Sequence, residues 1–230
     1  MGKYILESSF NEDEYTNFVC QEFDIQTNGK NITVIPQLDL SEISNDDWNI
    51  ILLIGNSGSG KSTILNNIGS LPTITYDYDK PIISQFPHLS PEEVTNLFCS
   101  VGLSSVPIWL HKPNELSNGE RARLDLCYLI ANNQGIILVD EFTSVVNRDV
   151  AKSLSFSLQR YIRATNKKII LASCHFDLID WLHPDYIFNL NKQDENGDCE
   201  LEHLIYKDDK AYQTYQNVNN NDILSEPKEI

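Results

Sequence analysis

The sequence predicts an α/β fold with a mostly parallel central sheet flanked by helices, and two observations carry this prediction. Apolar runs at residues 50–54, 136–139, 168–172 and 186–190 are continuous rather than alternating. Such runs are typical of strands that are buried on both faces of a parallel sheet. Helical patterns lie between the runs, so strands and helices alternate along the chain as they do in βαβ units.

Three helices are predicted between these strands. Ser90, followed by Pro91 and Glu93, and Ser117, followed by Glu120, both have the spacing of a capping box at a helix start. A third apolar stripe predicts a helix over residues 150–165. The first two helices, with the loop between them, form a short helical subdomain at about residues 86–133.

The N-terminal part is expected to be antiparallel β structure. Residues 15–25 and 31–38 are interpreted as strands, and the pair Asn28-Gly29 between them is a turn signal. Residues 200–206 predict one last strand. We expect a single domain over residues 1–214 and a disordered acidic tail over 215–230.

Composition limits the classes of function. The 230 residues carry a formal net charge of −16, which opposes general affinity for nucleic acid. Contact with nucleic acid would then require a local basic patch or a partner protein. No apolar run approaches the ~20 residues of a membrane span, so no span of its own is expected. The five cysteines are scattered and odd in number, as in reduced cytosolic proteins, and a cytoplasmic location is expected.

A phosphate-binding loop follows the first apolar run directly and precedes a helical stretch. Its residues are Gly55, Asn56, Ser57, Gly58, Ser59, Gly60, Lys61, Ser62 and Thr63, which fit the pattern G-x-x-x-x-G-K-[ST]. Glycines let main-chain N–H groups surround phosphate oxygens, and the helix N-terminus adds partial positive charge. Lys61 is expected to reach the β- and γ-phosphates and Ser62 to bind Mg²⁺, so the fold is expected to be that of a P-loop NTPase.

Two carboxylates end the second apolar run. Ligands of open parallel sheets bind at the carboxyl ends of strands, where Asp140 and Glu141 follow residues 136–139. Asp140 is expected to hold Mg²⁺, and Glu141 to polarise the water that attacks the γ-phosphate.

The segment Leu116-Ser117-Asn118-Gly119-Glu120 resembles the signature motif of ABC ATPases, with Asn118 where glycine is usual. A capped helix start that carries serine and glycine is also a physically reasonable anion site. The resemblance implies that Ser117, Asn118 and Gly119 close on the ATP held by another subunit. It therefore implies a head-to-tail dimer of two copies with two shared ATP sites.

The other elements of that family occur in order. Gln85 is similar to the glutamine that senses Mg²⁺ and the attacking water, and His175 to the switch histidine that contacts the γ-phosphate. The segment 144–147 resembles the dimer-contact loop, with Asn147 in place of the usual aspartate. Phe142 stands where proline commonly follows the catalytic glutamate. The family also implies ATP rather than GTP.

The aromatic side chain that stacks on adenine in this family is left open by the sequence. Tyr15, Phe23 and Trp48 are the candidates. Each of them is more readily explained as a packing residue, because aromatic side chains are commonly buried.

Three biological roles remain open at this point. The short helical subdomain and the segments 140–146 and 173–177 resemble a small group of soluble ABC ATPases, some of which are joined to an acetyltransferase-like domain. The leading hypothesis is a stand-alone ATPase whose ATP-driven dimerisation acts on an unidentified effector protein or a nucleic-acid-associated complex. The alternatives are the ATP-binding subunit of a membrane transporter and a slow-hydrolysing clamp or switch.

Overall fold

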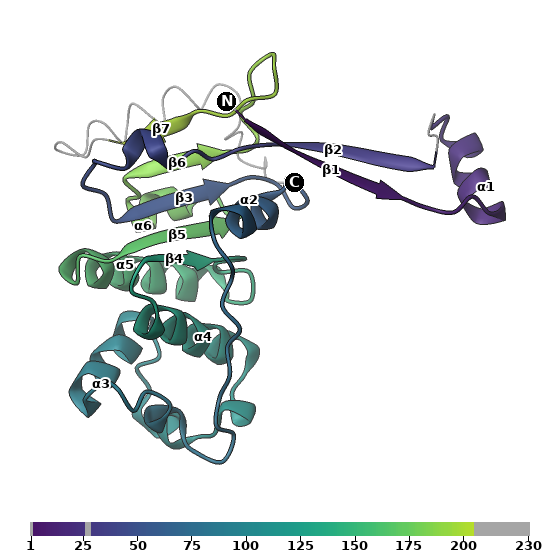
Figure 1. Ribbon diagram of the computed structural model, residues 1–230. Coiled ribbons are helices and arrows are strands. Elements are labelled where there is room, and N and C mark those ends of the chain that lie inside the picture. The colour runs from purple at the N-terminus through teal and green to yellow at the C-terminus, as the bar shows by residue number, and fades with distance from the viewer. Residues whose placement is uncertain (1, 26–28, 205–230) are drawn as a thin grey trace, which may run out of the picture.

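The computed structural model describes residues 2–25 and 29–204 of the chain (Figure 1). The predicted tail, 215–230, and the end of the predicted strand at 200–206 lie outside the described residues. The Asn28-Gly29 turn lies partly outside them.

A five-stranded sheet forms the centre of the molecule, with the strand order β4-β5-β3-β6-β7. Strands β3 (Ile50–Ile54), β4 (Ile136–Val139), β5 (Lys168–Ser173) and β6 (Tyr186–Asn189) are parallel. The edge strand β7 (Leu201–His203) is antiparallel to β6. This confirms the α/β fold with a mostly parallel sheet.

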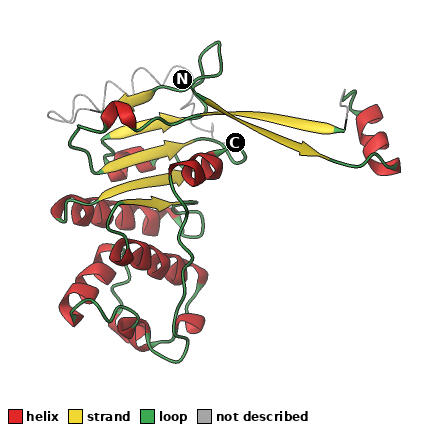
Figure 2. Cartoon of the chain, in the orientation of Figure 1, coloured by secondary structure: helices red, strands yellow, loops and turns green. Residues whose placement is uncertain are grey.

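Helices cover both faces of this sheet, as Figure 2 shows. Alternate residues of β3 point to opposite faces, and all five are buried. Leu52 belongs to the core that includes residues of α5 (Arg148–Ala164) and α6 (Leu178–Leu182). Leu53 belongs to a second core that includes residues of α2 (Lys61–Ile68). Burial on two faces is the reason why this strand has a continuous apolar sequence.

The helical subdomain lies below the sheet in Figure 1. It contains α3 (Pro91–Ser100), α4 (Asn118–Asn132) and between them the 3-10 helices η3 (Val106–Leu110) and η4 (Pro113–Glu115). Both predicted capping boxes are present, at Ser90 and at Ser117. Two further 3-10 helices, η1 (Ser41–Ile43) and η2 (Ile82–Ser84), lie outside this subdomain.

The N-terminal part is an antiparallel two-stranded arm with a helix at its tip. Strands β1 (Lys3–Ser9) and β2 (Lys30–Pro36) pair along their full length, and α1 (Glu14–Glu22) lies between them in sequence. We call residues 2–25 and 29–36 the arm and residues 37–204 the body. Figure 1 shows the arm extending away from the body.

The prediction of a strand at residues 15–25 was therefore wrong. Asp13 accepts a hydrogen bond from the Thr16 N–H at 2.8 Å, and the Thr16 side chain accepts one from the Asp13 N–H, also at 2.8 Å. This reciprocal cap begins a helix. The apolar residues Tyr15, Phe18 and Val19 have the spacing of one helix face. Strand β1 was not predicted.

Candidate functional site

The phosphate loop joins β3 to α2 at the carboxyl edge of the sheet. Gly58 has φ +79° and Gly60 has φ +98°, values in the region that favours glycine. A Cβ atom on Gly60 would lie 2.7 Å from two side-chain carbons of Ile35 on β2. The arm therefore packs at its base against the start of α2, and the loop has no room for a side chain at this position.

Two further contacts define the loop. The Asn56 N–H donates to Oδ1 of Asn191 at 3.0 Å, and Nδ2 of Asn191 donates to Oδ1 of Asn56 at 3.1 Å. Asn191 was not predicted, although polar residues directly after a parallel strand were a usable signal. The buried hydroxyl of Ser59 has no hydrogen-bond partner among the described residues. An orphaned polar atom inside a glycine-rich loop fits a loop that binds a polar ligand.

Lys61 connects the loop electrostatically to the neighbouring strand ends. Its ammonium donates to the carbonyl oxygens of Gly55 and Asn56, each at 2.7 Å. Partial burial holds the pKa of Lys61 below its ordinary value, and the nearby Cys174, Asp140 and Glu141 partly offset this effect. The structure thus brings Lys61 and both predicted carboxylates together.

The segment after β4 has an unusual main-chain conformation. Glu141 has φ +49° and Thr143 has φ +68°, which is uncommon for residues other than glycine. Strain of this kind is concentrated at functional sites. Residues 138–146 also line a cavity of about 330 Å³ between the sheet and α4. The predicted catalytic carboxylate, Glu141, therefore lies on a strained loop with free space behind it.

His175 follows β5 and contacts this same loop. Its Nδ1 lies 3.1 Å from the Thr143 hydroxyl oxygen. The same oxygen accepts a hydrogen bond from Nη1 of Arg148 at 3.3 Å. Arg148 also forms an ion pair with Asp177. Burial lowers the pKa of His175 and Arg148 lowers it further, whereas Asp177 opposes the shift. The neutral imidazole is favoured at pH 7.

The side chain of Gln85 makes its hydrogen bonds within the segment that precedes it in the chain. Its amide nitrogen donates to the carbonyl oxygen of Asp77 at 2.8 Å and to that of Lys80 at 3.1 Å, and its Oε1 accepts from the Asp77 N–H at 2.9 Å. These bonds close the loop over residues 77–81. Contact with Mg²⁺ requires the amide to leave them, so that role stays a prediction.

The predicted second anion site lies at the start of α4. Ser117 is the N-cap, and its hydroxyl contacts the Glu120 carboxylate at 2.7 Å. A Cβ atom on Gly119 would lie 3.3 Å from Cγ1 of Val146 and 3.5 Å from the Val145 oxygen. The segment 117–119 therefore packs against the predicted dimer-contact loop of its own chain. Asn147 at the end of that loop caps α5, accepting from the Val150 N–H at 2.9 Å.

The donor set fits a magnesium ion that is held jointly with phosphate groups. Mg²⁺ prefers oxygen ligands and usually binds one or two carboxylates together with phosphates of the substrate. Ser62 lies in the first turn of α2, and Asp140 is close enough to Lys61 to raise its pKa. These two residues are the ones that would hold Mg²⁺.

The three aromatic candidates for adenine stacking do not lie at this site. Tyr15 and Phe23 are on α1 or at its end, at the tip of the arm (Figure 1). Trp48 is only 3 % exposed and packs in the core with the Lys168 ammonium 4.6 Å from its ring centroid.

Comparison with known proteins gives two kinds of similarity. No protein-family model matches the chain. The lipoprotein-releasing system ATP-binding protein LolD of Pseudomonas syringae pv. tomato is 26% identical over 168 residues, covering 54% of this chain and 74% of LolD. The energy-coupling factor transporter ATP-binding protein EcfA1 of Staphylococcus aureus is 26% identical over 108 residues, covering 47% of this chain and only 36% of EcfA1.

Two solved structures have the same fold. The ATP-binding cassette MJ0796, in a dimeric post-hydrolysis state with ADP and phosphate, aligns with a TM-score of 0.56 and 17% identity over 89% of this chain and 100% of its own. The RNase-L inhibitor aligns with a TM-score of 0.55 and 15% identity over 74% of this chain and 37% of its own. In the part of the chain that the structure describes, no helix has the length and apolar character needed to cross a membrane.

Proposed function

We propose that the chain is an ABC-type ATPase domain, two copies of which bind Mg²⁺-ATP head to tail and hydrolyse it. The observation that carries this proposal is the cluster of Lys61, Asp140 and Glu141 at one edge of the sheet. A phosphate loop next to two carboxylates is an arrangement that binds a triphosphate and activates water.

Each residue has a distinct role in the proposed binding step. The main-chain N–H groups of residues 55–63 and the Lys61 ammonium bind phosphate oxygens. Lys61 exchanges its bonds with the Gly55 and Asn56 oxygens for bonds to phosphate. Ser62 and Asp140 would hold Mg²⁺, which would supply positive charge next to the phosphates.

Hydrolysis requires a base and a group that orients the γ-phosphate. Glu141 accepts the proton of the attacking water. His175, neutral because its pKa is lowered, donates a hydrogen bond to the γ-phosphate through its Nε2–H while Nδ1 faces Thr143. Gln85 would contact the attacking water and Mg²⁺ once its amide leaves the 77–81 loop.

The second half of each site comes from the other copy. Ser117, Asn118 and Gly119 present a helix N-terminus, which is an anion-binding element. Within one chain this element packs against Val146. In a head-to-tail dimer it closes on the γ-phosphate of the second copy, so that ATP is bound between the two copies.

The Glu141→Gln variant tests this proposal. ATP binding is expected to persist, while turnover falls about 10²–10⁴-fold, the usual contribution of a general base. Glu92→Gln, on the first turn of α3, is the matched control and is expected to keep normal turnover. Normal hydrolysis by Glu141→Gln would contradict the assignment.

The sequence relatives favour a second candidate for the biological role. LolD and EcfA1 are named as ATP-binding proteins of a lipoprotein-releasing system and of a transporter. The ATPase domain then acts on a membrane partner rather than on a cytoplasmic protein or a nucleic-acid-associated complex. Membrane fractionation of cells that express the Glu141→Gln variant separates these roles. Detergent-sensitive membrane association supports the transporter subunit, and its absence supports the stand-alone ATPase.

A further inference from the structure

One face of the arm exposes the apolar side chains of Ile5, Ile32 and Val34, beside the charged Lys3, Glu7 and Lys30. Residues that pair across an antiparallel ladder share a face, and Ile5 pairs with Val34 while Glu7 pairs with Ile32. Ile5 is 70% exposed, Ile32 65% and Val34 53%. On the opposite face, Ile35 is buried at the base against Gly60. An isolated two-stranded hairpin is at best marginally stable in water, so this face is expected to be covered by another surface.

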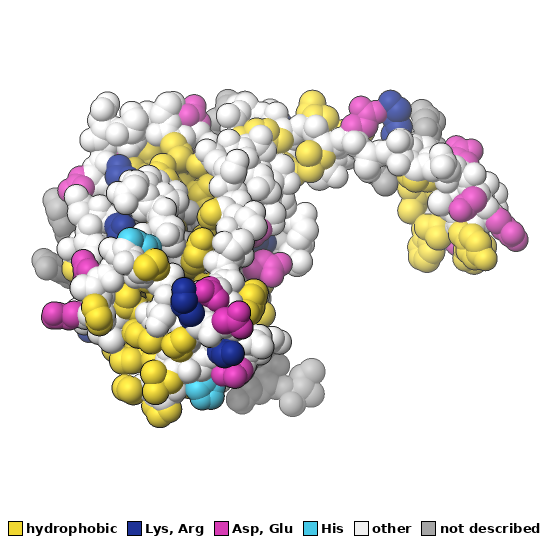
Figure 3. All heavy atoms as spheres, turned by 60° about the horizontal axis from the view of Figure 1, so that its bottom comes forward, with side chains coloured by type: hydrophobic (Ala, Val, Ile, Leu, Met, Phe, Trp, Pro, Cys, Tyr) yellow, Lys and Arg dark blue, Asp and Glu magenta, His cyan; other side chains and the backbone are white. Residues whose placement is uncertain are grey.

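The tip of the arm combines apolar and acidic groups. Tyr15, Phe18 and Val19 form one exposed face of α1, and Phe23 continues it; no residue of α1 is buried. Figure 3 shows these apolar side chains gathered on one side of the tip. The tip also carries Glu12, Asp13, Glu14, Glu22 and Asp24, and no lysine or arginine occurs between Lys3 and Lys30. The occupant must therefore offer apolar surface without strong negative charge.

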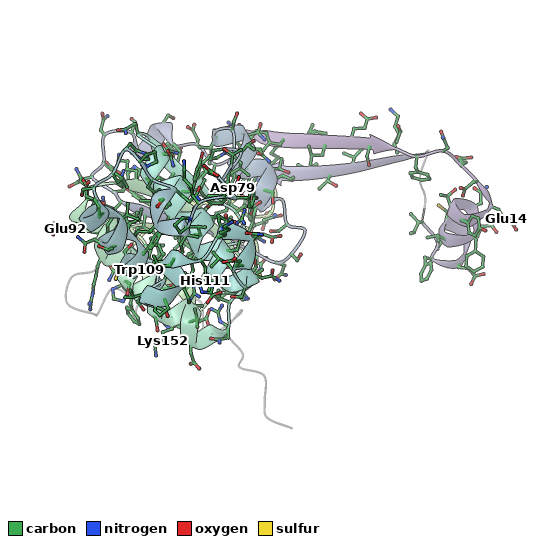
Figure 4. The ribbon with its side chains drawn as sticks, turned by 90° about the horizontal axis from the view of Figure 1, so that it is seen from below. Glu14, Asp79, Glu92, Trp109, His111 and Lys152 are labelled. Atoms are coloured by element: carbon green, nitrogen blue, oxygen red, sulfur yellow. The ribbon has the colours of Figure 1, made fainter. Side chains whose placement is uncertain are left out.

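The direction of the arm indicates where that surface lies. The arm starts beside the phosphate loop, at the Ile35–Gly60 contact. In Figure 1 it projects beyond the carboxyl ends of β3, β4 and β5, the edge that carries the ATP site. Figure 4 shows Glu14 at the tip, well separated from the body that carries Trp109 and His111. The second copy of the proposed ATP-bound dimer occupies the side of the molecule toward which the arm projects.

The body also exposes a small set of large apolar side chains. Most exposed large apolar side chains of the described residues lie on the arm, and the others are Tyr78, Val106, Leu110 and Val145. Val106 and Leu110 belong to η3, which ends seven residues before Ser117, and Val145 lies in the predicted dimer-contact loop. Lys112 lies two residues after Leu110, so this region also offers a positive charge to the acidic tip.

We propose that the arm clasps the second copy, with α1 docking on the surface formed by Val106, Leu110 and Lys112 of that copy. The proposal rests on the head-to-tail dimer described above. Because the dimer is symmetric, the contact occurs twice and each arm reaches across the shared site. An anionic membrane is a poorer occupant, because it repels the five carboxylates of the tip.

Photo-cross-linking in the purified Glu141→Gln protein tests this proposal. A benzoylphenylalanine placed at Tyr15 is expected to give a cross-linked dimer in Mg²⁺-ATP, with the attachment site mapped by mass spectrometry to residues 105–113. The same group placed at Asn17, on the opposite side of α1, is the control and is expected to cross-link weakly.

A binding measurement complements the cross-link. In Glu141→Gln, the added change Tyr15→Asp is expected to raise the dimer Kd about 10–100-fold, as for the loss of one aromatic anchor. Asn17→Asp adds the same charge to the other side of α1 and is expected to leave the Kd within about twofold. Circular dichroism of both variants establishes that they are folded.

The outcomes separate this inference from the proposed function. If the Glu141→Gln protein dimerises with ATP but Tyr15→Asp has no effect and no cross-link forms between copies, the clasp is overturned and the ATP dimer stands. If no ATP-dependent dimer forms at all, both are overturned. Tyr15-dependent binding to phosphatidylcholine–phosphatidylglycerol vesicles, without a cross-link between copies, would assign the tip to lipid and also overturn the clasp.

Discussion

Gly60 is the residue at which the phosphate loop depends most directly on its surroundings. Its φ of +98° disfavours any side chain, and Ile35 occupies the space that a Cβ atom would need. The same residue thus determines the loop conformation and the position of the arm.

We predict that Gly60→Ala destabilises the protein and weakens ATP binding. Positive φ and the 2.7 Å contacts with Ile35 together are expected to cost about 1–3 kcal/mol. Urea unfolding and ATP titration measure the two effects. Gly135→Ala is the control, since its nearest foreign atom would lie 3.7 Å away. Equal stability of the two variants would contradict the argument.

His175 gives a prediction for pH dependence. Its pKa is lowered in the folded protein by burial and then by Arg148. As the pH falls below about 6.5, the His175 imidazole is protonated in the unfolded chain before it is protonated in the folded protein. Protonation of His175 is therefore expected to lower the free energy of unfolding in acid. NMR titration of the imidazole should give a pKa below that value. In Arg148→Gln the pKa should rise, whereas in Arg160→Gln it should stay unchanged.

At the scale of elements, Tyr76 and Tyr78 connect α4 to the Gln85 loop. Arg121 on α4 lies over the Tyr76 ring, 4.5 Å from its centroid, and donates to the Tyr78 hydroxyl at 3.1 Å. Asp77 between the two tyrosines is held by the Gln85 amide. The helix that begins at Ser117 and the loop that contains Gln85 are therefore joined by one continuous set of contacts, although neither tyrosine belongs to a regular strand or helix.

Removing Arg121 is predicted to uncouple these two elements. Arg121→Ala loses the ring contacts and the hydrogen bonds to Asp125 at 3.1 Å and to the Pro113 oxygen at 3.1 Å. We expect a loss of about 1–2 kcal/mol in the free energy of unfolding, limited by partial exposure, and a larger fall in ATP turnover than in ATP binding. Arg121→Lys should not restore turnover, because lysine lacks the planar group that makes these contacts. Unchanged turnover in Arg121→Ala would argue against the connection.

At the scale of the whole molecule, each proposed ATP site is divided between two copies. Lys61 and Glu141 lie on one copy and Ser117 and Gly119 on the other. Two variants that are each inactive alone can then complement one another, since a mixed dimer contains one intact site.

We predict complementation between Lys61→Ala and Ser117→Asp. Aspartate keeps the helix cap but repels the phosphate. In an equal mixture about half of the dimers are mixed, so activity is expected to recover to about a quarter of the wild-type value if the two sites act independently. ATPase assays of the separate and mixed proteins measure this. The absence of recovery in mixtures that contain mixed dimers would refute the divided site.

Some features of this protein follow from its sequence alone. The continuous apolar runs predicted the parallel strands, because burial on both faces leaves no polar positions. The phosphate loop, the two carboxylates and both capping boxes depend on neighbours in the chain, so local sequence was sufficient to locate them. The predicted roles of these residues in catalysis still await the experiments above.

Other features were decided only by tertiary structure. The sequence could not show that residues 15–25 form a helix at the tip of an arm, because apolar spacing in a short exposed segment is ambiguous between helix and strand. Nor could it show that Ile35 occupies the space beside Gly60, that Asn191 holds the loop, or that the Gln85 amide faces Asp77. These contacts join residues whose separation in the chain ranges from 8 to 135 positions. Their pairing depends on how the strands, the arm and the helical subdomain pack, which no local pattern of residues encodes.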